Sequence, residues 1–197
     1  MASSWQRLGS TTLSSSGDTM DLTITAKDHL KIIIHTIKTG SVDNTSFRFN
    51  TDTGNNYTWR VSDGGGSDST QANYNYLRIP FANADCFSEV RIVNYAGREK
   101  LIGMETTVID TQGAGTAPER TEVVGKWTNT SNQITAVKCW QSGSGSFDTG
   151  STMTIFGTDD DVLGNVYPNL TNGAIFEESD TGKHYMFDGT SAWNEVT

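Results

Sequence analysis

The feature that most constrains the fold is an alternation of apolar and polar residues on either side of short polar segments. Between Thr45 and Ser62, two runs place aromatic or β-branched residues at every second position, and the polar segment Asn50–Asn56 separates them. This alternation is typical of a half-buried strand. Gly and Asn in the separating segment tolerate the positive φ that a chain reversal needs. The stretch therefore predicts a β-hairpin, and similar stretches recur along the chain.

About ten such segments follow one another at the spacing typical of a sandwich or barrel, and none has the apolar period of a helix. Leu30–Ile37 is more continuously apolar, which predicts a central strand covered on both faces. Glu122–Thr128 and Ile134–Trp140 predict a second hairpin. The other predicted strands of the body are 19–25, 74–79, 86–95, 101–109 and 152–156. We predict an all-β, antiparallel β-sandwich, with a jelly roll favoured because that topology protects its edges.

The 197 residues suggest one main domain with appendages. Residues 1–18 predict a polar N-terminal arm, residues 19–158 the β-sandwich domain, and residues 159–197 a linker with a small C-terminal β-hairpin module. Three short strands bury little core alone, so the module should dock on the body or on another chain. The residues expected to make contacts between chains are Trp5, Leu8, Phe176, Tyr185, Phe187 and Trp193.

The formal net charge of −9 argues against a nucleic-acid partner, because phosphate binding needs clustered Lys and Arg. No apolar run reaches the ~20 residues of a membrane-spanning helix, and residues 1–18 lack the apolar centre of a signal peptide. Assembly in the cytoplasm would explain the lack of a signal peptide, and no membrane partner is expected. Cys86 and Cys139 each lie in a predicted strand, so a disulfide stays open, but two buried free thiols are favoured.

Phe147–Ser151 spells Phe-Asp-Thr-Gly-Ser, the active-site signature of aspartic proteases, in which two aspartates share one proton. Asp52 and Asp180 begin further Asp-Thr-Gly copies in polar turns. Asp-Thr-Gly is also good turn chemistry between strands, and the flanking apolar residues of a buried catalytic loop are missing. The histidines show no metal-ligand spacing. We therefore predict no enzyme and no catalytic residue, with an aspartic protease as a remote alternative.

Two kinds of binding site remain open. Asn50, Asp52, Asn55 and Asn56, and separately Asp159–Asp161, could offer oxygen ligands to calcium, but the carboxylates are too few for a full ligand set. We predict no metal and no cofactor. Aromatic side chains on a sheet can also form a sugar-binding platform, although strand aromatics are more often buried or paired. The platform candidates are Tyr57, Trp59, Tyr74, Tyr76, Trp127 and Trp140.

Four stretches of the body share the strand-and-turn character described above: RFNTDTGNNYTWR, GDTMDLTITAKDHLKIIIHTIKTG, GKWTNTSNQITAV and FDTGSTMTIFG. These stretches resemble segments of structural proteins of tailed viruses, particularly marine phages. The C-terminal NGAIFEESDTGKHYMFDGTSAWNEV resembles a hairpin module often appended to phage tail and fibre proteins. The resemblance implies a virion structural protein with no enzymatic activity, located in the virion, that decorates the capsid or forms part of a tail or fibre.

Such a protein would act by self-association and by docking on other virion proteins. Its expected partners are copies of itself, with a trimer favoured, and other proteins of the particle. The main alternative is a carbohydrate-binding module that recognises a glycan on the host surface.

Overall fold

The computed structural model describes residues 5–39, 42–79, 85–109, 112–159, 173–178, 180–189 and 192–196. The chain divides into two compact units: a body, Trp5–Asp159, and a C-terminal unit that includes residues 160–197. The described residues form strands and turns and contain no helix, and the strands pair antiparallel throughout. This confirms the predicted all-β class.

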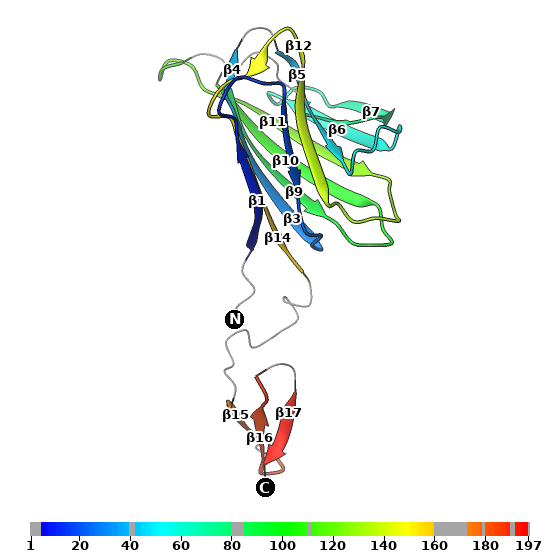
Figure 1. Cartoon of the computed structure of the whole chain (residues 1–197), viewed down its shortest axis with the longest axis vertical. Helices are drawn as coiled ribbons and strands as arrows, with labels where there is room; N and C mark the ends of the chain where they lie inside the picture. Colours follow the sequence, from blue (N-terminus) through cyan, green and yellow to red (C-terminus); the bar gives the residue numbers. More distant parts are fainter. Residues whose placement is uncertain are drawn as a thin grey trace. The chain divides into compact units, whose positions relative to one another are not determined.

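The body is a β-sandwich of a large and a small sheet, and Figure 1 shows the small sheet lying over the large one. In spatial order, the large sheet contains β1 (Gln6–Thr12), β14 (Thr152–Thr158), β3 (His29–Thr36), β9 (Asp85–Val93), β10 (Lys100–Ile109), β11 (Glu119–Trp127), β6 (Tyr57–Asp63) and β7 (Ser69–Tyr74). The small sheet contains β2 (Thr19–Thr23), β12 (Ala136–Gly143), β5 (Val42–Phe49) and β8 (Leu77–Ile79). The two-residue strands β4 (Lys38–Thr39) and β13 (Ser146–Phe147) pair with each other. The jelly-roll topology stays a prediction.

One core lies between the two sheets. It joins apolar side chains of the large sheet, such as Ile32 and Trp127, to Phe47 and Val137 of the small sheet. Strand β3 supplies Leu30, Ile32 and Ile34 to this core, while its alternate side chains point outward. The prediction that this strand is covered on both faces is wrong. Although the strand is more continuously apolar in sequence than the others, its side chains alternate between the core and the outside, with Lys31, Ile33 and His35 at the outward positions.

Neither of the two hairpins predicted in the body forms. The strands β5 and β6 flank the segment Asn50–Asn56 but belong to different sheets, because β5 pairs with β12 and β8 while β6 pairs with β11 and β7. The strands β11 and β12 are likewise divided between the sheets. Alternation specifies which side chains face the core but not which strand is the neighbour. Both connections exceed the two to five residues of a usual hairpin loop, and so they can cross from sheet to sheet.

The predicted N-terminal arm contains a strand of the body. Residues 6–12 form β1 at the edge of the large sheet, where it pairs with β14. Leu8 packs against the core, and Ser10 hydrogen bonds to Thr154 through their hydroxyl groups, 3.1 Å apart. Most residues of this strand are polar and show no apolar alternation, which is why the sequence did not predict it. An edge strand needs only backbone pairing on one side, and β1 obtains that from β14.

The C-terminal unit contains a three-stranded antiparallel sheet, in the order β15 (Ile175–Glu178), β16 (Lys183–Phe187) and β17 (Trp193–Val196). Short turns reverse the chain, with Gly182 and Gly189 at φ 67° and 81°. Positive φ is the reason that glycine suits both positions.

Candidate functional site

The protease-like motif forms a turn between β13 and β14. The Asp148 carboxylate accepts hydrogen bonds from the Ser16 hydroxyl at 2.8 Å and from the Thr149 amide at 2.7 Å. These bonds, that from Ser16 above all, hold the pKa of Asp148 below its ordinary value. Gly150 adopts φ 91°, and the Ser151 amide donates to the Asp148 carbonyl at 3.1 Å. The motif is therefore a closed turn around an ionised carboxylate.

The first candidate calcium loop uses its carboxylate to accept N–H bonds. The Asp52 carboxylate accepts from the Trp127 indole at 2.7 Å, from the Asn56 amide at 2.9 Å and from the Gly54 backbone at 2.8 Å. Burial raises the pKa of Asp52, but the hydrogen bonds outweigh burial and lower the pKa overall. Both oxygens of the Asp52 carboxylate therefore accept N–H hydrogen bonds, and the bond from Trp127 holds this connection between the sheets against β11.

At the second acidic segment, Asp159 forms an ion pair with Lys27 at 2.6 Å and accepts from the Asp28 amide at 3.1 Å. Asp160 and Asp161 lie outside the described residues. Within the part of the chain that the structure describes, no three His, Cys, Asp or Glu side chains gather in a way that could hold a metal ion.

Three of the six aromatics considered for a sugar-binding platform lie in the core, as is usual for aromatic residues of strands. Tyr57, Trp59 and Trp127 are buried, and the rings of Tyr57 and Trp127 stack inside the core with their centroids 6.3 Å apart. The other three candidates are half-buried and pack edge to face in a chain, Tyr74 on Tyr76 and Tyr76 on Trp140, at centroid distances of 5.0 and 5.7 Å.

Both cysteines are buried free thiols. The Cys86 sulfur lies 2.9 Å from the Thr36 hydroxyl, and burial raises the pKa of Cys139 far above its ordinary value. Because the thiolate is the reactive form of cysteine, Cys139 is chemically inert at neutral pH.

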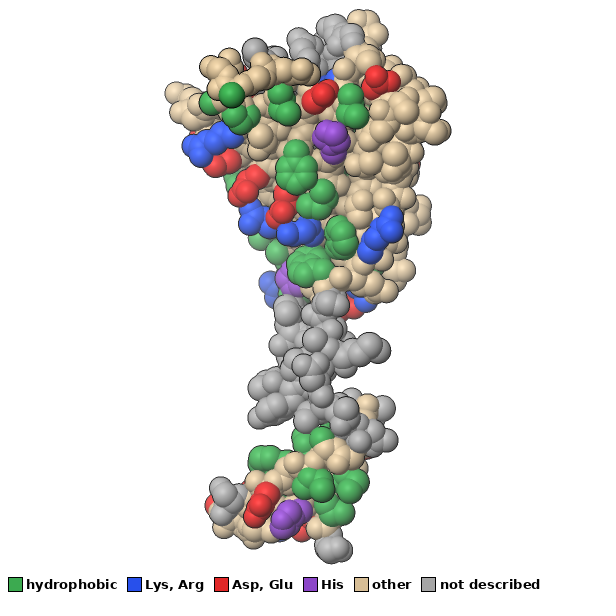
Figure 2. Space-filling view, turned by 90° about the vertical axis from the view of Figure 1, so that its left-hand side faces the viewer, with side chains coloured by type: hydrophobic (Ala, Val, Ile, Leu, Met, Phe, Trp, Pro, Cys, Tyr) green, Lys and Arg blue, Asp and Glu red, His purple; other side chains and the backbone are tan. Residues whose placement is uncertain are grey.

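The outward side of the large sheet carries several large apolar residues that the body does not bury. We call this surface the outer face; it is formed by the side chains of β3, β9, β10, β11 and β6 that alternate with the core. Phe87, Leu101, Ile109 and Val124 are 49–59% exposed on it. Figure 2 shows hydrophobic, basic and acidic side chains intermixed on one side of the body. Sequence reasoning missed this surface.

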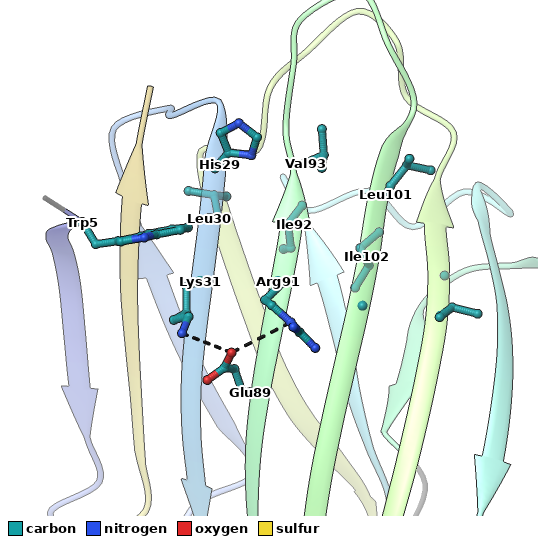
Figure 3. A pocket seen from close by; sticks show the side chains of 13 residues that line it. Trp5, His29, Leu30, Lys31, Glu89, Arg91, Ile92, Val93, Leu101 and Ile102 are labelled. Atoms are coloured by element: carbon teal, nitrogen blue, oxygen red, sulfur yellow. Dashed lines mark ion pairs between the residues drawn. The ribbon is translucent and has the colours of Figure 1, made fainter. Parts of the chain in front are cut away.

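Charged side chains cross the outer face between the apolar ones. The Glu89 carboxylate lies 3.1 Å from the Lys31 ammonium and 3.9 Å from the Arg91 guanidinium, as the dashed lines in Figure 3 mark. Arg91 also forms an ion pair of 2.8 Å with Glu105. These are surface pairs of small individual value, but together they hold Arg91 between two carboxylates on neighbouring strands.

An open groove of about 730 Å³ runs across the same strands. Gly103 lies in its floor, where an added Cβ would meet nothing within 4 Å, and its rim includes Arg91, Leu101 and Val124. Trp5 closes one side: its ring reaches from the start of β1 across β14 toward β3 (Figure 3) and stays 46% exposed.

The predicted contact residues fall into two groups. In the body, Trp5 is exposed beside the groove, whereas Leu8 packs against the core. In the C-terminal unit, Phe176, Tyr185, Phe187 and Trp193 occupy one face of the sheet, with neighbouring ring centroids 5.4–6.4 Å apart. Their role in contacts between chains stays a prediction.

The other face of the C-terminal sheet also carries apolar side chains, among polar ones such as Glu177 and His184. Ile175 lies opposite Met186 in the strand pairing, Val196 lies on the same face, and all three are exposed. Phe176 and Trp193 on the first face are exposed as well. A three-stranded sheet has no second layer of its own to cover either side, so the described part of this unit leaves apolar surface open on both faces.

A scan against protein-family models, a search of curated proteins and a search of solved structures each found no match. Within the described residues, no helix has the length and apolar character needed to cross a membrane.

Proposed function

We propose that the chain is a non-enzymatic structural component of a virion, assembled in the host cytoplasm, which decorates a capsid or forms part of a tail or fibre. It acts by self-association, with a trimer favoured, and by docking on other virion proteins. The observation that carries this proposal is the C-terminal unit, a three-stranded sheet with exposed apolar side chains on both faces.

Such a sheet gains stability by covering its faces with another chain. Burying apolar surface is worth about 25 cal/mol per Å², and a large side chain taken from water contributes about 1.5–3 kcal/mol. Phe176, Trp193 and Ile175 are 52%, 36% and 66% exposed, and so much of that gain is still available on docking. Aromatic residues gathered on one face are typical anchors of a protein interface.

The test is attachment of the full-length chain to purified virus particles, measured by co-sedimentation through a density gradient. The chain should migrate with the particles. The double substitution Phe176→Ser and Trp193→Ser should leave it at the top of the gradient, because it removes the aromatic anchors without removing the module. Asn194→Ser, an exposed polar change in the same sheet, is the matched control and should attach normally. Equal attachment of the double variant, or no attachment of the unaltered chain, would overturn the proposal.

A further inference from the structure

We propose that the outer face of the large sheet pairs with the same face of a second copy, about a two-fold axis that runs across the strands. This inference deepens the self-association part of the proposed function but concerns only the body. A two-fold contact does not build a trimer, so the proposed trimer would come from the C-terminal unit.

The strand register arranges the outer face in rows that run across the sheet. Residues opposite one another in neighbouring strands lie in the same row, and successive outward rows are two residues apart along each strand. One row is basic and apolar, with Lys31, Arg91, Gly103, Val124 and Arg60. The next row is acidic, with Ile33, Glu89, Glu105, Glu122 and Ser62.

A two-fold axis midway between these rows places the basic row of each copy over the acidic row of the other. Since the axis runs along the rows, each strand lies over the same strand of the partner. Arg91 of one copy then meets Glu89 of the other, and Glu105 enters the open space that Gly103 leaves beside Arg91.

The same rotation brings apolar side chains together in the flanking rows. Val93 and Leu101 lie in one flanking row, and Phe87 and Thr107 lie in the other. Val93 therefore meets Phe87 of the second copy, with Leu101 beside them. The rotation also brings Lys126 near Arg120 of the second copy. The repulsion between these two cations is reduced by carboxylates of their own chains, because Lys126 pairs with Glu99 at 2.8 Å and Arg120 lies 3.6 Å from Glu122.

The charge and the size of the face both fit a second copy. The chain carries a formal charge of −9, which opposes contact between copies elsewhere, but the outer face is nearly balanced. Its basic side chains are Lys31, Arg60, Arg91, Arg120 and Lys126, and its acidic ones are Asp85, Glu89, Glu105 and Glu122. At standard spacings the five strands cover about 24 Å by 27 Å. That is about 650 Å² from each copy, within the range of a specific dimer.

Pairing through the sheet edges is less suited to this molecule. Both edges of the large sheet are irregular: the pairing of β1 shifts between Arg7 and Gly9, and the pairing of β7 shifts opposite Tyr57 and Trp59. Asn73 in β7 also adopts φ 57°. Bulges and kinks of this kind prevent an edge strand from accepting another strand.

A charge swap tests the proposed geometry. The full-length chain carrying Phe176→Ser and Trp193→Ser isolates the body contact, and sedimentation equilibrium should give twice the chain mass of 21.4 kDa. In this background, Arg91→Glu should raise the dimer Kd by about tenfold or more, because it meets Glu89 and Glu105 of the second copy. Adding Glu89→Arg should restore most of the affinity. Lys138→Glu on the small sheet is the control for net charge and should change little.

A monomer in this background would overturn the inference while leaving the virion proposal intact. An unchanged dimer Kd for the Arg91→Glu chain would also overturn it. The same holds if the double variant Arg91→Glu with Glu89→Arg does not regain affinity although circular dichroism shows its fold unchanged. If particle attachment fails but the swap recovers, the body contact stands and the virion assignment falls.

Discussion

On the outer face of the large sheet, Leu101 and Val124 are more than half exposed, whereas the small sheet covers its large outward aromatic. There, the Arg48 guanidinium lies 4.6 Å from the centre of the Trp140 ring, and Tyr76 packs against the ring edge. Both sheets supply one face to the same core, so folding does not explain the difference. On the small sheet, polar and aromatic neighbours shield the outward ring of Trp140 from solvent. On the large sheet, no comparable shielding by the residues that the structure describes reduces the exposure of Leu101 and Val124. This contrast favours a partner for the large sheet.

The largest effect should come from neighbouring positions on β11 that point opposite ways. A Cβ at Gly125 would lie 2.4 Å from Leu77 and 3.1 Å from the Thr58 carbonyl, while Val124 points outward and is 59% exposed. Gly125→Ala should cost about 1–3 kcal/mol through overpacking, and Val124→Ala about 0.5 kcal/mol or less. Urea unfolding measures both. A large loss at Val124 would mean that the outer apolar residues serve folding, and the contrast between the faces would fail.

A smaller effect should come from the connection that joins the sheets. Asp52→Ala removes the acceptor for the Trp127 indole and should cost about 1–2 kcal/mol. The hydrogen bonds lower the pKa of Asp52 in the folded chain below its unfolded value of 3.8. The ionised carboxylate therefore stabilises the fold fully above that pH, and this stabilisation is lost as the pH falls through the folded pKa.

Unfolding at pH 7 and at progressively lower pH checks this. The gap in stability between the unaltered chain and Asp52→Ala should close below about pH 4. A gap that stays constant down to pH 2 would contradict the role given to the ionised carboxylate.

The smallest effect should come from uncovering the small sheet. Arg48→Ala removes the guanidinium from Trp140 and should cost about 0.5–1 kcal/mol. It should also shift tryptophan fluorescence to the red, since the ring gains contact with water. An unchanged emission spectrum would show that Arg48 does not shield the ring. Lys138→Ala, on the same strand as Trp140, is the control.

Alternation in the sequence was sufficient to predict the class and most strands of the body, because the side chains that face the core must recur at every second position. It did not predict β1, whose polar residues give no such signal, nor the partners of β5 and β6, since alternation carries no information on strand order. The Asp-Thr-Gly motif was correctly predicted to be a turn.

The outer face had a signal that the sequence reasoning did not use. Apolar doublets such as Cys86–Phe87, Leu101–Ile102 and Val123–Val124 break the alternation. In a strand, one member of each doublet must point away from the core. The row arrangement depends on register between strands far apart in the chain, so it could not be read from the sequence alone.

The most direct test of the association surface is the concentration dependence of mass for the full-length chain and for Leu101→Glu, paired with urea unfolding of both. Because Leu101 is 56% exposed, its replacement should leave the unfolding midpoint nearly unchanged while weakening association about tenfold or more. Identical masses for the two chains at every concentration, with equal stability, would contradict the account.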